Sequence, residues 1–213
     1  MRYHRIPDET VRRLPVYLRG ALLLSQQGVE STSSKELAGL IGVEPWQIRK
    51  DFSYFGDFGT PGVGYNLRSL IKHVNKVLRL DTGHKAALVG VGNLGSALLS
   101  FPGFRMYGFE IAVAFDCDRR KIGRRKGGIV IEDVATLGDL GAEGIHLGII
   151  AVPESVSQHI ADALTEAGVK GLLNFSSRHI AVARGVKVIT IDIAMDLARL
   201  PYYMPAGREV RSR

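Results

Sequence analysis

The chain has 213 residues, 46% of them hydrophobic and 23% charged, a composition typical of one or two globular domains. No apolar run approaches the roughly 20 residues of a membrane-spanning helix, and the polar N-terminus contains no signal-peptide core, so we expect a cytoplasmic protein. A single cysteine excludes an intrachain disulfide framework, while the net charge of +7 is compatible with nucleic acid but not diagnostic.

Residues 10–28 predict an amphipathic helix that ends at Gly28, because Leu14, Leu18 and Ala21 recur at helical spacing. Pro15 is acceptable there if it lies near the start of the helix. A second helix is predicted from Ser33 to Ile41. Ser33 and Glu36 have the spacing of a capping box, and Gly42 ends the apolar stripe.

A third helix is predicted to begin at Glu44-Pro45, because proline favours the first helical turn. Its buried face is expected to contain Trp46, Ile48, Phe52 and Phe55. Its other face is expected to expose polar side chains suited to base edges and phosphates, namely Gln47, Arg49, Lys50, Ser53 and Tyr54.

The two short helices have the dimensions of a helix-turn-helix. The stretch 57–65 is rich in glycine and predicts a tight hairpin or loop, in effect a wing with Gly62 and Tyr65 as candidate DNA contacts. A fourth helix is predicted from Leu67 to about residue 80. Charge and spacing also allow a small helical bundle with a solvated basic face, such as a dimerisation cap.

After a linker at 81–84, the pattern changes to apolar strands alternating with helices. Such alternation predicts a doubly wound α/β fold with a parallel sheet. The expected strands are residues 86–89, 109–115, 145–152, 171–175 and 186–191, and the expected helices are residues 94–101, 154–167 and 193–200.

The first of these strands is followed by a G-x-G-x-x-G turn that opens a helix. In such a turn Gly90 permits a tight bend, Gly92 admits a pyrophosphate and Gly95 allows close packing of the helix. The residues that form the turn and the first helical turn are Gly90, Val91, Gly92, Asn93, Leu94, Gly95 and Ser96. A tight turn without a nucleotide is the alternative.

Asp116 follows the next strand, about 20 residues after the last glycine, where a dinucleotide site has its ribose-binding acid. A carboxylate there accepts from the ribose hydroxyls and repels a 2′-phosphate, which favours NAD over NADP. Later strands end at Val152-Pro153 and Asn174-Phe175, and these ends are expected to line the same crevice. A plain exit from strand to loop is the alternative for each.

Five stretches resemble the Rex family of redox-sensing repressors: residues 47–56, residues 62–65, the glycine turn at 90–95, Phe101-Pro102-Gly103-Phe104, and Leu173-Asn174-Phe175. The resemblance implies a homodimeric repressor of palindromic operator DNA that binds in the apo or NAD+ state and is released by NADH. It also implies a C-terminal helix, in 192–213, that is exchanged between subunits.

By position, the resemblance implies that Arg49, Lys50 and Ser53 contact DNA and that Asp116 binds the ribose. Arg19 and Asp192 match a pair of charged residues that form a switch between subunits. Phe101 stands where the family often has a tyrosine between that pair, and Pro61 stands where the wing commonly has a basic residue.

The predicted domains are therefore a winged helix at 1–80, a linker at 81–84, a Rossmann domain at 85–191, and a dimerisation helix with a basic tail at 192–213. The alternative is an NAD-dependent oxidoreductase with a helical N-terminal extension. It lacks an evident proton donor, since the histidines are scattered and His179 is the nearest to a strand end. No metal-ligand spacing occurs. A nucleotide-sensing module that binds only protein is a further alternative.

Overall fold

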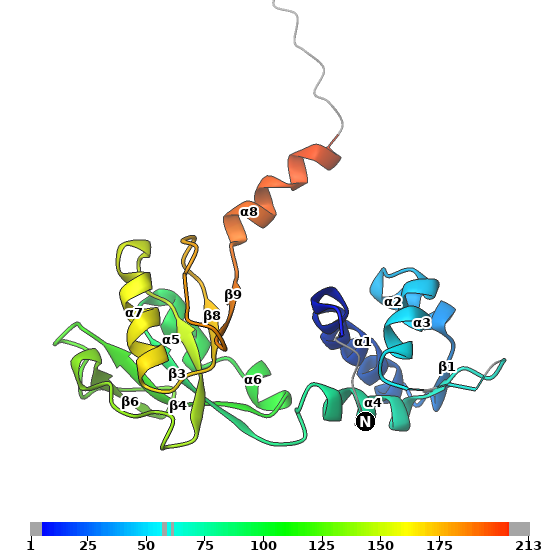
Figure 1. Ribbon diagram of the computed structural model, residues 1–213, viewed down its shortest axis with the longest axis horizontal. Helices are drawn as coiled ribbons and strands as arrows, with labels where there is room; N and C mark the ends of the chain where they lie inside the picture. Colours follow the sequence, from blue (N-terminus) through cyan, green and yellow to red (C-terminus); the bar gives the residue numbers. More distant parts are fainter. Residues whose placement is uncertain (1–5, 57–58, 61, 205–213) are drawn as a thin grey trace, which may run out of the picture. The chain divides into compact units, whose positions relative to one another are not determined.

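The computed structural model describes residues 6–56, 59–60 and 62–204 (Figure 1). The chain divides into two compact units, Met1–Thr82 and Gly83–Arg213, here called the N-terminal unit and the C-terminal unit. Pro61 and the basic tail from residue 205 onward lie outside the described residues.

The N-terminal unit combines helices with a small antiparallel ladder. Its described elements are α1 (Asp8–Gln26), β1 (Ser31–Thr32), α2 (Ser34–Ile41), α3 (Pro45–Ser53), β2 (Tyr65–Asn66) and α4 (Leu67–Val77). β1 pairs with β2, with Thr32 opposite Tyr65, and Thr60 forms a bridge with Gly64; residues 59, 60 and 62–66 are here called the wing. Helix-turn-helix and wing are therefore both present.

The predicted boundaries of α2 are confirmed. The Ser33 hydroxyl accepts from the Glu36 N–H at 3.1 Å, and the Glu36 carboxylate accepts from the Ser33 N–H at 2.7 Å. This is a complete capping box, and it satisfies two N–H groups that would otherwise lack partners. Gly42 ends the helix in the left-handed conformation.

Two details of the N-terminal unit differ from expectation. Helix α1 begins after Pro7, so Pro15 lies inside the helix rather than near its start. Trp46 is 54% exposed, whereas Ile48 and Phe52 are buried. Because Trp46 precedes Ile48 by two residues, it lies roughly 200° around the helix from the buried face.

The C-terminal unit is a doubly wound sheet with one antiparallel edge strand. Its strands are β3 (His84–Val89), β4 (Phe109–Asp116), β5 (Arg125–Lys126), β6 (Ile129–Asp133), β7 (Ile145–Ile150), β8 (Gly171–Asn174) and β9 (Lys187–Thr190). Its helices are α5 (Asn93–Leu99), α6 (Gly103–Met106), η1 (Val134–Thr136), α7 (Glu154–Glu166), α8 (Ile193–Ala198) and η2 (Leu200–Tyr203).

The strands lie in the order β5-β6-β4-β3-β7-β8-β9, and all pairs except β5–β6 are parallel. Numbered along the chain, the six parallel strands have the order 3-2-1-4-5-6, which is that of a Rossmann fold. The predicted fold class is confirmed. The direction of winding reverses between β3 and β7, and nucleotides bind at such a reversal point.

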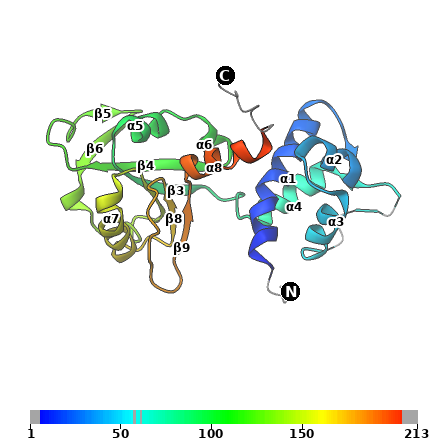
Figure 2. The same ribbon diagram turned by 90° about the horizontal axis from the view of Figure 1, so that it is seen from above.

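Both faces of the central strand β3 are covered, which explains its continuous apolar run. In β3, Ala87 and Val89 belong to a core beneath α7, while Ala86 and Leu88 belong to a core beneath α5 and α6. Figure 2 shows α5 and α7 on opposite sides of the sheet. A strand with both faces buried has no polar alternation, so the sequence shows a short apolar run.

The short strands β5 and β6 and the helix α6 are among the elements that were not predicted. β5 and β6 form a hairpin around Gly127-Gly128, a dipeptide typical of two-residue turns, and α6 follows Pro102. β3 begins at His84, so this residue belongs to the strand and not to the predicted linker at 81–84.

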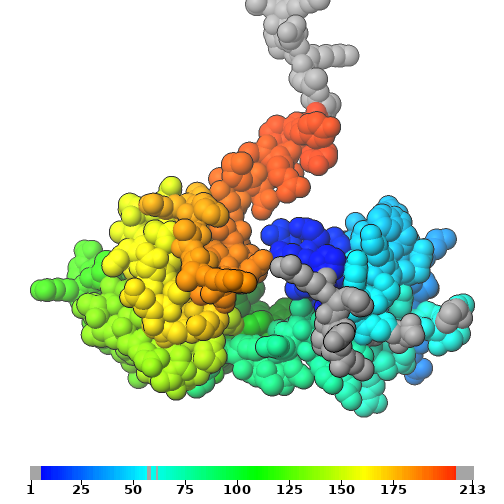
Figure 3. Space-filling view, viewed as in Figure 1, coloured from blue at the N-terminus to red at the C-terminus, as the bar shows by residue number. Residues whose placement is uncertain are grey.

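The C-terminal segment α8–η2 is apolar and exposed, and Figure 3 shows it in orange-red, extending from the C-terminal unit. Ile193, Leu197 and Leu200 are 67%, 63% and 54% exposed. An apolar hollow of about 490 Å³ also opens beside Phe101 and Phe104 over β7 and β8. None of the described helices is long and apolar enough to cross a membrane.

Candidate functional site

The carboxyl ends of the central strands form one row in the C-terminal unit. Val89 pairs with Phe115 on β4 and with Ile150 on β7, and Ile150 pairs with Asn174 on β8. The loops that follow these strands therefore open on a common edge, beside the reversal point of the sheet.

Each glycine of the turn has a different steric environment. Gly90 has a φ of +95°, and a Cβ there would lie 2.5 Å from the carbonyl oxygen of Ala151. A Cβ on Gly95 would lie 1.9 Å from the carbonyl oxygen of Gly90, so the protein itself requires both glycines. A Cβ on Gly92, by contrast, would meet no protein atom within 4 Å. The space outside Gly92 is therefore open to a ligand.

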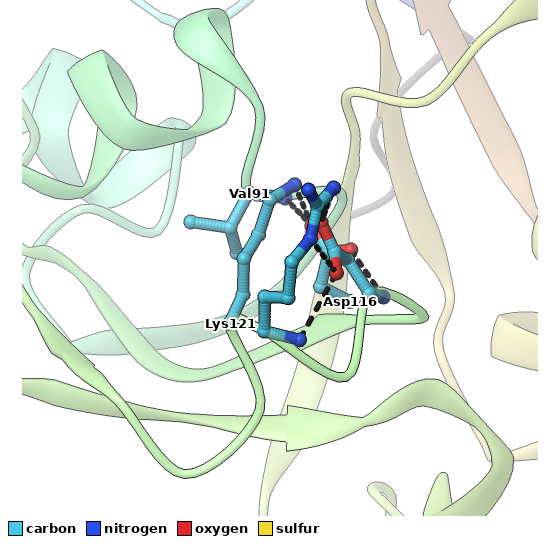
Figure 4. Close-up of polar contacts among 5 residues, drawn as sticks. Val91, Asp116 and Lys121 are labelled. Atoms are coloured by element: carbon cyan, nitrogen blue, oxygen red, sulfur yellow. Dashed lines mark hydrogen bonds and ion pairs between the residues drawn. The ribbon is translucent and has the colours of Figure 1, made fainter.

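The carboxylate of Asp116 connects the glycine turn with the loop after β4 (Figure 4). It accepts from the Val91 N–H at 2.8 Å, from the Asp118 N–H at 2.9 Å and from the Lys121 ammonium at 2.9 Å. Burial by itself raises the pKa of Asp116, but these three donors outweigh it and lower the pKa below its usual value. Asp116 is therefore ionised, and a carboxylate retains acceptor capacity beyond three bonds.

Asn174 is completely buried, and its side chain organises the loop after β8. Its amide donates to the carbonyl oxygens of Ser176 and Arg178, each at 3.0 Å, and to the Thr190 hydroxyl at 3.3 Å. Its carbonyl oxygen accepts from the N–H and the hydroxyl of Ser176. Asn174 therefore shapes this side of the crevice through the backbone that it fixes.

The remaining predicted nucleotide residues are distributed along the same edge. Gly92, Asn93, Leu94 and Pro153 are exposed, whereas Ser96, Val152 and Phe175 are half-buried. Val91 is buried and contributes its backbone N–H to Asp116 rather than a free side chain.

In the N-terminal unit, α3 presents a polar face. Arg49, Lys50 and Ser53 are all exposed, and Tyr54 is half-buried at the C-cap. The Arg49 guanidinium donates to the Ser34 hydroxyl at 2.8 Å, and the Ser53 hydroxyl donates to the Lys50 carbonyl at 2.7 Å. A hollow of about 460 Å³ lies between this face, the start of α2 and the wing, and Gly62 and Val63 line it.

The opposite side of α3 is fixed to α1 through Asp51, which is completely buried. The Arg13 guanidinium donates to both of its oxygens, at 2.6 Å and 2.9 Å. The Tyr17 hydroxyl donates at 2.5 Å, the Thr10 hydroxyl at 3.0 Å and the Gln47 amide at 2.9 Å. Burial by itself raises the pKa of Asp51, yet these donors lower it to about 2.

Two predicted DNA contacts lie elsewhere than expected. Gln47 is half-buried, and its amide is bonded to Asp51 instead of being directed outward. Tyr65 is 8% exposed, and its ring packs edge-on against Phe52 with centroids 5.2 Å apart. The Tyr65 ring therefore belongs to the core of the unit, and the Gln47 amide is held by the buried Asp51.

The predicted switch residues occur on both units. Arg19 is exposed on α1, and Phe101 is 55% exposed and packs edge-on against Phe104. Asp192 caps α8 by accepting from the Met195 N–H at 3.0 Å.

Sequence reasoning missed the Asp51 cluster and Lys121. The partners of Asp51 on α1 lie 34 to 41 residues away along the chain, so no local pattern reports them. Lys121 lies only five residues after Asp116, and a basic residue so close to a predicted ribose-binding acid was a usable signal. In the described part of the chain, no three His, Cys, Asp or Glu side chains are grouped to hold a metal ion.

Two family models match the chain in different places. Residues 5–53 match a model described as a putative DNA-binding protein N-terminus. Residues 81–178 match a model described as a CoA binding domain.

Relatives that match nearly the whole chain are described as redox-sensing transcriptional repressor Rex. The protein from Chloroflexus aggregans is 43% identical over 199 residues, which cover 93% of this chain and 94% of the relative. The protein from Desulfitobacterium hafniense is 41% identical over 209 residues, which cover 98% and 100%.

Solved structures agree with these relatives. The structure described as RSP in complex with beta-NAD+ and operator DNA has a TM-score of 0.88 and 33% identity, and the match covers 94% of this chain and 93% of that one. The complex of RSP with beta-NADH has a TM-score of 0.84 and 31% identity, with 94% of each chain covered.

Proposed function

This chain belongs to the Rex family of redox-sensing transcriptional repressors, and we propose that it binds operator DNA with its N-terminal unit and NAD(H) with its C-terminal unit. The observation that carries this proposal is the likeness, at 33% identity and over 94% of the chain, to a Rex-family repressor described in complex with NAD+ and operator DNA. Both units of the chain take part in that match.

The dinucleotide lies along the row of strand ends. Its pyrophosphate approaches Gly92, where the protein leaves open space, and the N–H groups at the start of α5 face its charge. Asp116 accepts from the adenosine ribose, which favours NAD(H) over a 2′-phosphorylated nucleotide. Val152, Pro153 and Phe175 line the continuation of the crevice.

A binding experiment separates the nucleotides. NADH and NADPH are titrated by fluorescence, with CoA as a third ligand because it also contains adenosine and a pyrophosphate. We expect NADH to bind more tightly than NADPH, and Asp116→Ser to remove the difference. Equal affinity of the wild-type chain for the two nucleotides would contradict the role of Asp116.

Arg49, Lys50 and Ser53 contact the DNA, with Tyr54 and Gly62 at the edges of the same surface. Arginine and lysine neutralise phosphates and bind guanine, and each phosphate contact makes affinity fall with salt. The double variant Arg49→Ala, Lys50→Ala is expected to lower operator affinity and reduce the salt dependence. Lys72→Ala, which removes an exposed cation from α4, is the control. Unchanged affinity in the double variant would refute this assignment.

The active form is a homodimer. The apolar side chains of α8 and the hollow over β7 and β8 are both uncovered in a single chain, and a second copy would bury both. Sedimentation should give a dimer for the wild type. Leu197→Asp, which places a charge on α8, should shift it toward monomer, and a monomeric wild type would contradict the proposal.

Nucleotide redox state controls DNA binding. NAD+ and NADH differ by one positive charge on the nicotinamide, and a ligand shifts a conformational equilibrium only by its differential affinity. Arg19 of one subunit pairs with Asp192 of the partner subunit, and this charge pair responds to the redox state of the nucleotide. Phe101 contributes no hydroxyl to the pair.

Operator DNA and NAD(H) share one compartment, so the protein acts in the cytoplasm.

The test measures operator affinity with apo, NAD+-loaded and NADH-loaded protein. NADH is expected to weaken binding relative to the other two states, and Arg19→Ala is expected to reduce that difference. Equal affinity in all three states would refute redox control.

A further inference from the structure

Trp46 is a large apolar side chain that α3 leaves in solvent. It follows Pro45 at the start of the helix and is 54% exposed, while Ile48 and Phe52 on the same helix are 0% and 2% exposed. Scattered aliphatic side chains on a surface are ordinary, but tryptophan carries the largest apolar area of any residue. The exposure of Trp46 therefore indicates that a binding partner covers this side chain.

The position of Trp46 on the helix indicates which partner. Residues separated by three, four and seven positions lie on one face of a helix, and Trp46 has these separations from Arg49, Lys50 and Ser53. Those three side chains are all exposed. Trp46 is therefore the N-terminal member of the same solvent-facing stripe.

In a helix-turn-helix, the N-terminal residues of the second helix contact base edges in the major groove. Trp46 is at that end of α3, ahead of the basic residues. Its ring offers an apolar surface, which suits the C5-methyl group of thymine, the one apolar group that the major groove presents. Cations and hydroxyls on the same stripe cannot supply that contact.

We propose that Trp46 is a specificity-determining DNA contact that packs against a thymine methyl group in the major groove of the operator. This inference rests on the proposed function, because it requires that α3 enters the groove. It assigns base discrimination to an apolar side chain, whereas Arg49 and Lys50 supply charge. Removal of Trp46 therefore lowers specific affinity without changing the salt dependence.

The chain contains one tryptophan, so emission excited beyond the absorption of tyrosine reports on Trp46 alone. A duplex selected by the purified protein from random sequence serves as operator, and its affinity is measured by anisotropy of a labelled strand. Saturation with this duplex is expected to lower quenching of Trp46 by acrylamide at least about threefold, because the groove shields the ring. An unrelated duplex of equal length should shield it less.

The second arm is a double-mutant cycle with the methyl group. Replacing one thymine at a time by uracil should weaken wild-type binding at one or two positions by about fourfold, as expected for the loss of one buried methyl group. Trp46→Ala should weaken binding to the thymine duplex similarly and should show no further loss with uracil. Trp46→Phe should restore part of the affinity.

Leu23→Ala is the matched control, because Leu23 is a 42% exposed apolar residue on α1, away from the stripe. Circular dichroism melts establish that each variant is folded. Normal operator affinity in Trp46→Ala, together with quenching of Trp46 in the wild-type chain that DNA leaves unchanged, would overturn this inference while leaving the repressor function intact. Failure of the wild type to select any duplex would instead overturn the proposed function, and this inference with it.

Discussion

Replacing Asp51 with asparagine is expected to destabilise the N-terminal unit by about 3 kcal/mol, because removing one partner of a buried ion pair costs about 3–5 kcal/mol. The lower end applies since the Arg13 side chain remains 28% exposed and regains some hydration. In the wild type, donors that include Tyr17 and Gln47 share the two carboxylate oxygens of Asp51. Asparagine replaces one of these oxygens with an NH₂ group, which is itself a donor and cannot accept from them.

The pH dependence gives an independent magnitude. The pKa of Asp51 is about 2 in the folded chain, against about 3.9 for a free aspartate. Because the folded pKa is the lower one, the stabilisation is present above about pH 4 and is lost as pH falls through about 2. A difference of about two pKa units corresponds to about 2.6 kcal/mol, close to the estimate from the broken pair.

The assay is urea unfolding at pH 7 followed by Trp46 emission, which reports the N-terminal unit because the chain has no other tryptophan. Asp8→Asn is the control, since the Asp8–Arg12 pair is more than half exposed on both sides and such pairs contribute less than about 1 kcal/mol. A loss below about 1 kcal/mol in Asp51→Asn would refute the reasoning, because the buried cluster would then contribute no more than a surface pair.

Other predictions concern the turn, a cap and the loop after β8. Gly92→Val should abolish NADH binding in a fluorescence titration and leave the melting temperature unchanged, because its Cβ meets no protein atom; a lower melting temperature would contradict this. Gly95→Ala should lower both NADH affinity and the melting temperature, since its Cβ would lie 1.9 Å from a carbonyl oxygen. Ser33→Ala should cost about 1 kcal/mol in urea unfolding by loss of the cap, and an unchanged midpoint would exclude that role. Asn174→Leu should lower the calorimetric melting temperature of the C-terminal unit, because it removes the hydrogen bonds of the Asn174 side chain to the loop after β8. An unchanged melting temperature would show that other contacts hold this loop.

Local sequence patterns determined most of the elements. Ser33, Glu36 and Gly42 specify the ends of α2 because capping is a matter of neighbours three or four residues apart. The continuous apolar runs specified parallel strands, although β9 is mostly exposed rather than buried, and the spacing of the glycines and Asp116 indicated a dinucleotide site. The hairpin of β5 and β6 was missed although Gly127-Gly128 marks its turn, because short exposed strands carry no hydrophobic signal.

Sequence by itself therefore determined the two units, the Rossmann turn and the polar stripe of α3. Tertiary structure decided which side chains of those elements remain available to a ligand. Asp51 and Gln47 are committed to a cluster with α1, Tyr65 to the core, and Trp46 to solvent. The physical reason is that Asp51 is held by residues of α1 that lie 34 to 41 residues away and Tyr65 by Phe52 of another element, and local periodicity does not encode contacts between elements.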